Sequence, residues 1–105
     1  MADLLKILQQ AQQVQGRLQE LQEQLQQKTV TGIAGGGMVT VEADGRGNVR
    51  RVRIDPSVVN PNDVEMLEDL VSVAVSDAQQ KAATLAKEEM SKATGGLDLP
   101  FKLPF

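Results

Sequence analysis

The stretch Thr31–Ile54, TGIAGGGMVTVEADGRGNVRRVRI, decides the fold because it separates two long helical patterns with residues typical of strands and turns. Apolar and polar residues alternate over Met38–Ala43, which indicates a strand with one buried face. The turn residues Asp44–Gly47 follow, and Asn48–Ile54 is again rich in valine and isoleucine. These segments predict an antiparallel β-hairpin.

The second strand of this hairpin does not alternate strictly. Its apolar residues are Val49, Val52 and Ile54. They can share one face only if an extra residue is inserted near Arg50 and Arg51. We therefore expect a β-bulge there, with three side chains directed together away from the apolar face: Arg50, Arg51 and Arg53.

The glycine-rich segment Thr31–Gly37 precedes the hairpin. Its glycines disfavour a helix and predict either a turn or an edge strand that another backbone approaches closely. A phosphate-binding loop would need a lysine and a hydroxyl after the glycines and would lead into a helix, whereas this segment leads into a strand. The segment therefore does not predict nucleotide binding.

A long helix is predicted on the N-terminal side, over Asp3–Lys28. Its apolar residues are spaced alternately by three and four: Leu4, Ile7, Ala11, Val14, Leu18, Leu21 and Leu25. This spacing is a heptad seam and predicts a helical partner, either the second long helix of the same chain or a helix of a second subunit. At 1.5 Å per residue the helix is about 37 Å long, so part of it should project or pair.

A second long helix is predicted from Pro61, with Asn60 as its N-cap and Asp63 in its first turn. Its first half is apolar over a broad sector and should form the core, whereas its second half keeps few apolar residues and should project. Thr94–Gly96 ends the helix. Residues 1–96 are predicted to form a single α+β domain, with a small antiparallel sheet between two long helices, and residues 97–105 a flexible tail.

The composition excludes most kinds of catalysis. The 105 residues include no His, Cys, Tyr or Trp, so the usual general base, thiol nucleophile and soft metal ligands are absent. We expect no enzyme activity, cofactor, metal or small-molecule substrate. Glu65 and Asp69 lie four residues apart, but carboxylates near a helix start are explained by the helix dipole.

The two aromatic residues, Phe101 and Phe105, both fall in the tail. A core of small aliphatic side chains buries little area, which favours a homodimer. No apolar run is long enough to span a membrane, and no cysteine is present, so we expect a soluble cytoplasmic protein.

The net charge is −3, so attraction to nucleic acid requires a local basic patch. Such a patch is present in the hairpin as Arg46, Arg50, Arg51 and Arg53, with no carboxylate between Gly45 and Ile54. These guanidinium groups are candidates for phosphate contacts. The alternative is a solvated strand face that is neutralised by nearby acidic residues, namely Glu42, Asp44 and Asp55.

Six further basic residues are candidates for DNA contacts. The first helix carries Lys6, Arg17 and Lys28, whose spacing of eleven keeps them on one side. The second half of the second helix carries Lys81, Lys87 and Lys92. In both groups the alternative is an ordinary charged surface that confers solubility.

Three segments resemble the YbaB/EbfC family of bacterial nucleoid-associated proteins: TGIAGGGMVTV (Thr31–Val41), RRVRIDPS (Arg50–Ser57) and VEMLEDLVSVAVSDA (Val64–Ala78). The ending LDLPFKLPF (Leu97–Phe105) is similar to the tail of that family as well. The resemblance implies an intertwined homodimer with a central antiparallel sheet and helices that project like tweezers. It also implies binding of double-stranded DNA with weak or variable sequence preference.

Two functions follow as hypotheses. The first is a nucleoid protein that binds duplex DNA as a homodimer and affects nucleoid organisation and gene expression. Family members often have lysine along the first helix where this chain has glutamine, so if the projecting helices grip DNA, the resemblance implies weaker binding by this chain. The second is a protein-interaction adaptor or prefoldin-like holdase that acts through its projecting helices.

Overall fold

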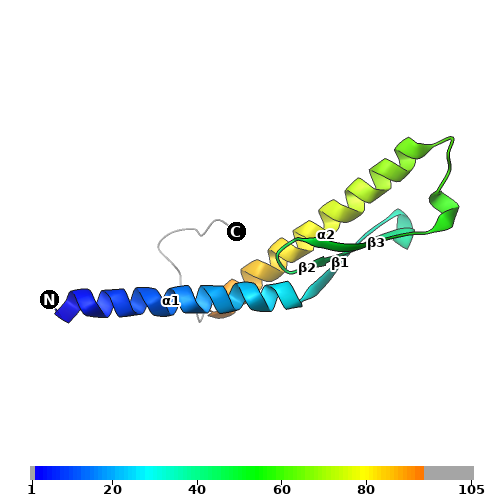
Figure 1. Ribbon diagram of the computed structural model, residues 1–105. Coiled ribbons are helices and arrows are strands. Elements are labelled where there is room, and N and C mark those ends of the chain that lie inside the picture. Colours follow the sequence, from blue (N-terminus) through cyan, green and yellow to red (C-terminus); the bar gives the residue numbers. More distant parts are fainter. Residues whose placement is uncertain (1, 94–105) are drawn as a thin grey trace.

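The structure is a computed structural model that describes residues 2–93, and it confirms the α+β architecture (Figure 1). In chain order the elements are α1 (Ala2–Gln27), β1 (Thr29–Ala34), β2 (Val39–Asp44), β3 (Val49–Ile54) and α2 (Val64–Ala93). Short 3₁₀ turns occupy Gly35–Gly37 and Pro56–Val58. The predicted flexible tail, residues 97–105, lies outside the described residues.

The three strands form one antiparallel sheet in the order β1-β2-β3. The glycine-rich segment is therefore an edge strand, one of the two possibilities that the sequence allowed. β1 starts at Thr29, before the predicted segment, and pairs with β2 from Thr29↔Asp44 to Ala34↔Val39. The strand ends where Gly35, Gly36 and Gly37 turn the chain with φ values of 61°, 67° and 98°, which glycine adopts without strain.

The predicted β-bulge is confirmed. Glu42 pairs with Arg51 and Ala43 pairs with Val49, so Arg50 is the extra residue between them. Since residues that face each other across two strands share a face, β3 places its apolar residues on the side of the buried residues of β2. On β3 these residues are Val49, Val52 and Ile54.

α2 packs across one face of the sheet, against β1 and β2, and this contact forms the main core (Figure 1). The contact is close because small residues meet there. A Cβ atom on Gly32 of β1 would lie 2.2 Å from the Ala74 carbonyl oxygen and 2.4 Å from the Ala78 amide nitrogen. Ala74 and Ala78 are fully buried. The close approach predicted for the glycine-rich strand is thus made by the backbone of α2.

The predicted start of the second helix at Pro61 is wrong, because α2 begins at Val64. The Asn60 side chain accepts a hydrogen bond from the Asn62 amide at 2.9 Å, and the Asn60 carbonyl accepts one from the Asp63 amide at 2.9 Å. This turn satisfies the local donors without a helix. Asp63 then caps α2, since its carboxylate accepts a hydrogen bond from the Met66 amide at 3.2 Å.

The prediction that the second half of this helix projects is also wrong. Met90 of α2 is buried against Leu21 and Leu25 of α1, and Lys28 bonds to Glu89 at 2.5 Å. A few small or flexible apolar residues suffice there because the facing helix supplies two leucines. The C-terminal part of the heptad seam therefore has α2 of the same chain as its partner.

The N-terminal part of α1 projects instead, and it gives the protein a long shape of 71 × 22 × 18 Å (Figure 1). Its seam residues Leu4, Ile7 and Val14 are 62%, 60% and 56% exposed. The expectation that part of the first helix projects is confirmed.

Candidate nucleic-acid interface

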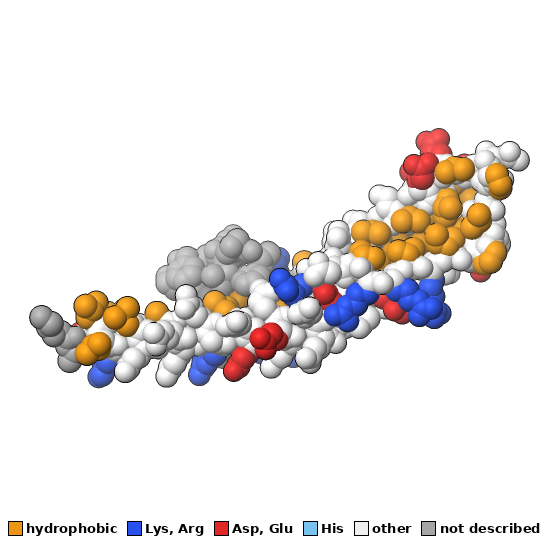
Figure 2. Space-filling model, viewed as in Figure 1, with side chains coloured by type: hydrophobic (Ala, Val, Ile, Leu, Met, Phe, Trp, Pro, Cys, Tyr) orange, Lys and Arg blue, Asp and Glu red, His pale blue; other side chains and the backbone are white. Residues whose placement is uncertain are grey.

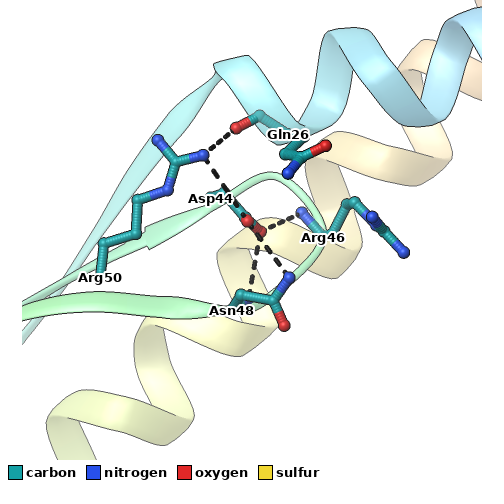
Figure 3. Close-up of polar contacts among 5 residues, drawn as sticks. All are labelled: Gln26, Asp44, Arg46, Asn48 and Arg50. Atoms are coloured by element: carbon teal, nitrogen blue, oxygen red, sulfur yellow. Dashed lines mark hydrogen bonds and ion pairs between the residues drawn. The ribbon is translucent and has the colours of Figure 1, made fainter.

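The hairpin turn between β2 and β3 is organised by the carboxylate of Asp44, which is 2% exposed (Figure 3). One carboxylate oxygen accepts hydrogen bonds from the amides of Arg46 (2.8 Å) and Asn48 (3.0 Å), and the other accepts one from the Asn48 side chain (3.2 Å). Burial raises the pKa of Asp44, but these hydrogen bonds outweigh it and hold the pKa below its usual value. The carboxylate stays charged and fixes the loop that carries Arg46.

The same turn supplies hydrogen-bond donors to the last carbonyl groups of α1. The Gly45 amide donates to the carbonyl oxygens of Leu25 (2.8 Å) and Lys28 (3.1 Å). The Arg50 guanidinium donates to the Gln26 carbonyl and lies 3.8 Å from the Asp44 carboxylate (Figure 3). Carbonyls at a helix end lack partners within the helix, and a cation there is favourable. Arg50 is therefore occupied in joining the hairpin to α1.

Arg51 and Arg53 lie on the face of the sheet opposite α2. They pair with Glu42 and Thr40, which alternate with the buried residues of β2. Arg46 is exposed at the turn. Within residues 2–93 none of the three guanidinium groups takes part in a hydrogen bond or ion pair. Figure 2 shows a row of Lys and Arg side chains along the hairpin.

The nearby acidic residues neutralise the cluster only in part. Asp44 meets Arg50, whereas the Asp55 carboxylate accepts a hydrogen bond from the Ser57 amide at 2.8 Å, which lowers the pKa of Asp55. Glu42 faces Arg51 across the strands, but within residues 2–93 its carboxylate forms no ion pair. Of the four hairpin arginines, only Arg50 is therefore neutralised by a nearby carboxylate in the described part of the chain. The other three remain available for phosphate contacts.

Three of the six other basic candidates are held by carboxylates. Lys28 and Lys92 lie 2.5 Å and 3.9 Å from Glu89, and Lys81 lies 3.1 Å from Asp77. The hydrogen bond from Lys28 lowers the pKa of Glu89. The others are exposed and far from the hairpin in sequence: Lys6 and Arg17 on the projecting part of α1, and Lys87 on α2. The structure thus does not gather the ten basic candidates into one site.

Sequence reasoning missed the role of Lys81. Its ammonium group donates to the Thr31 carbonyl at 2.9 Å, and the Asp77 carboxylate accepts from the Ile33 amide at 3.0 Å. The hydrogen bond from the Ile33 amide is the main reason that the pKa of Asp77 is lowered. Together the two side chains of α2 occupy the outer edge of β1, which would otherwise be open to another strand. The i, i+4 spacing of Asp77 and Lys81 was the available signal.

Sequence reasoning also missed an uncovered apolar face on β3. All six residues of β3 are exposed, and Val49, Val52 and Ile54 are 41%, 41% and 38% exposed. Figure 2 shows a continuous hydrophobic area over the sheet and the N-terminal half of α2, bordered by basic side chains. In the described part of the chain no three His, Cys, Asp or Glu residues are placed to hold a metal, and no helix is long and apolar enough to cross a membrane.

Comparison with known proteins identifies the family. A family model described as the YbaB/EbfC DNA-binding family matches residues 1–97. A nucleoid-associated protein of Gemmatimonas aurantiaca is 54% identical, over 98% of this chain and 99% of its own length. One from Xylella fastidiosa is 50% identical, over 98% and 96%.

A solved structure agrees with this result. The crystal structure of an uncharacterized protein from Helicobacter pylori superposes with a TM-score of 0.68 and 26% identity, over 83% of this chain and 95% of that one. The family match, the relatives and the fold agree with one another. The chain is therefore a member of the YbaB/EbfC DNA-binding family.

Proposed function

We propose that this protein binds double-stranded DNA with little sequence specificity, as a homodimer, through its hairpin arginines. The observation that carries the proposal is the free state of three guanidinium groups, Arg46, Arg51 and Arg53, in a protein with a net charge of −3. Two of the nearby carboxylates, Asp44 and Asp55, are engaged in hydrogen bonds of the fold. A local positive surface on an acidic protein is suited to phosphates.

The geometry of the hairpin favours phosphate contacts over base recognition. Arg51 and Arg53 project from the same face of one strand, about 7 Å apart at 3.3 Å per residue. Each DNA strand presents a phosphate about every 3.4 Å along the helix axis, so both side chains can reach the backbone of one strand. The described part of the chain has no aromatic side chain on which unpaired bases would stack.

The homodimer is proposed from the uncovered face of β3. β3 is an edge strand that pairs with β2 on one side and, within residues 2–93, has no neighbouring strand on the other. It carries the exposed residues Val49, Val52 and Ile54. A second copy placed there would cover the apolar area and join two sets of arginines along one surface. With three arginines from each copy, about six phosphates would be neutralised, which gives a slope of log K against log[salt] of about −5.

The biological setting follows from these proposals. Binding without strong sequence preference suits a protein that organises DNA over long stretches, so we place it on the nucleoid in the cytoplasm, with effects on gene expression. We propose a binding protein made of one domain, residues 1–96, and not an enzyme. The relatives that carry the name nucleoid-associated protein support this assignment.

The test is a fluorescence-anisotropy titration of two unrelated 30-base-pair duplexes at several salt concentrations. We expect similar affinities for both duplexes, and a loss of at least about tenfold for the double variant Arg51→Ala/Arg53→Ala, with a shallower salt slope. The matched control is Lys87→Ala/Lys92→Ala, which removes the same charge from α2 and should bind nearly as the parent protein. An equal loss in both variants would mean that binding follows net charge and that the hairpin assignment is wrong.

The adaptor or holdase hypothesis has one supporting observation, the exposed apolar residues on the projecting part of α1. Apolar helix faces of this kind bind other helices or unfolded segments. The titration also separates the two functions. Absence of binding to either duplex at low salt would favour the adaptor, because phosphate contacts are strongest there.

A further inference from the structure

The apolar seam of α1 changes abruptly from covered to uncovered along its length. Leu21 and Leu25 are 5% and 2% exposed because α2 packs on them, whereas Leu4, Ile7 and Val14 are more than half exposed. Figure 2 shows hydrophobic side chains gathered at the free end of α1, and Lys and Arg side chains along the other side of the same helix. Covering each large side chain is worth roughly 1.5–3 kcal/mol, so this face favours an occupant.

α2 ends beside the point on α1 where the uncovered part of the seam begins. Met90 is 8% exposed in the cluster with Leu21 and Leu25, and the helix ends at Ala93, less than one turn later. A shallow groove lies at the same junction, lined by Arg17, Glu20, Leu21, Gln24, Glu89 and Lys92. Residues 94–105 therefore continue from a point beside the last covered turn of the seam.

Residues 94–105 are long enough to cover the exposed apolar side of α1. From Leu18 to Leu4 the seam extends about 21 Å at 1.5 Å per residue. Twelve residues, 94–105, can span up to about 40 Å when extended. The segment can reach the free end of α1 without strain.

The sequence of the segment fits the face as well. Every second residue from 97 onward is apolar: Leu97, Leu99, Phe101, Leu103 and Phe105. The prolines between them disfavour a helix and favour an extended backbone, in which alternate side chains point to one side.

We propose that residues 97–105 bind along the exposed apolar side of α1 of their own chain, from Leu18 toward Leu4, with Phe101 and Phe105 as anchors. The segment would cover the face that the adaptor hypothesis requires to be free. The proposal does not depend on DNA binding, so each can fail without the other.

The test uses the full chain in solution by NMR. Phe101 and Phe105 are its only aromatic residues, so every contact between an aromatic proton and a methyl group outside residues 97–105 reports where this segment lies. We expect nuclear Overhauser effects from the Phe rings to the methyl groups of Ile7 and Val14. Contacts to Val52 and Ile54 instead, or none outside the segment, would overturn the proposal.

Two variants and one mixing experiment sharpen the result. Val14→Gln should abolish the aromatic contacts, whereas Gln12→Ala, on the far side of α1, should leave them unchanged. Val14 is 56% exposed, so circular dichroism should show an unchanged fold. In a mixture of isotope-labelled and unlabelled protein, a contact within one chain joins two labelled protons of the same copy. A contact between copies also joins a labelled proton to an unlabelled one. Contacts that arise only between copies would refute binding to the same chain's α1.

Discussion

At the scale of single residues, Asp44 explains how the hairpin is attached to the C-terminal end of α1. Its buried carboxylate organises the turn, and that turn supplies Gly45 and Arg50 to the last carbonyls of α1. Among four arginines in one hairpin, therefore, Arg50 has a structural task and the others face solvent. Sequence alone presents them as equivalent, because the partner of Arg50 is a backbone carbonyl of a distant helix.

The carboxylates of this network predict how stability depends on pH. The pKa values of Asp44, Asp55, Asp77 and Glu89 are all lowered in the fold. Each carboxylate thus binds protons more weakly in the folded than in the unfolded chain, so its contribution is complete above the unfolded pKa of about 4 and is lost as the pH falls through the lower folded value. Urea denaturation should give constant stability from pH 7 to about 5 and decreasing stability below about 4.

The variant Asp44→Asn separates this residue from the other three. It keeps an oxygen acceptor but carries no charge, so it should be less stable at pH 7 by about 1–3 kcal/mol and should lose less stability on acidification. Glu23→Ala, which changes an exposed residue of α1, is the control and should follow the parent curve. A parent-like pH dependence for Asp44→Asn would show that Asp44 does not contribute to the acid transition.

At the scale of elements, the contact between α2 and β1 depends on the smallest side chains. Gly32, Ala74 and Ala78 let a helix backbone approach a strand more closely than larger residues permit. The sequence signalled this through the glycine-rich segment. It did not identify the approaching backbone, because a glycine pattern contains no information about its neighbour.

Replacing Gly32 tests this contact. Gly32→Ala should lower the free energy of unfolding by at least about 2 kcal/mol, because the new methyl group would meet backbone atoms that cannot turn aside. Gly16→Ala is the matched control, since no atom lies within 4 Å of its added Cβ and the helix should gain up to about 1 kcal/mol. Equal effects in urea denaturation would contradict the close helix–strand contact.

At the scale of the whole molecule, the protein is long and leaves two apolar surfaces uncovered, the face of β3 and the free part of α1. We assign the first to a second copy and the second to residues 97–105. The first assignment would bring two arginine sets together, whereas the hairpin of one copy alone presents three free guanidinium groups. Assembly and DNA binding are therefore expected to be coupled.

A charge placed on the β3 face tests that coupling. Val52→Asp should convert the proposed dimer to a monomer in sedimentation velocity, because a carboxylate would have to be buried between the copies. The salt slope of DNA binding should fall to about half of the parent value, since half as many phosphates are contacted. Val59→Asp is the control, a valine outside the sheet that is 54% exposed, against 41% for Val52. A variant that remains dimeric would refute the proposed interface.

The sequence by itself determined the order of the two helices and the hairpin, the pairing of the two hairpin strands, and a bulge near Arg50 and Arg51, because these depend on local alternation and turn residues. It left the glycine-rich segment as either a turn or an edge strand, and the structure showed the edge strand. It was wrong about the start of α2, where the Asn60 turn and the Asp63 cap together replaced a proline-led start. It was also wrong about the half of α2 that projects, because periodicity describes which face is apolar and not what covers it.

Only the tertiary structure decided which basic residues are free. Lys28, Lys81 and Arg50 look like surface charges in the sequence, but each bonds to a residue at least 24 positions away. Whether a cation is available depends on the distance to carboxylates and carbonyls that folding brings near. The sequence therefore identified a basic hairpin, and the contact of Arg50 with the end of α1 left Arg46, Arg51 and Arg53 free within it.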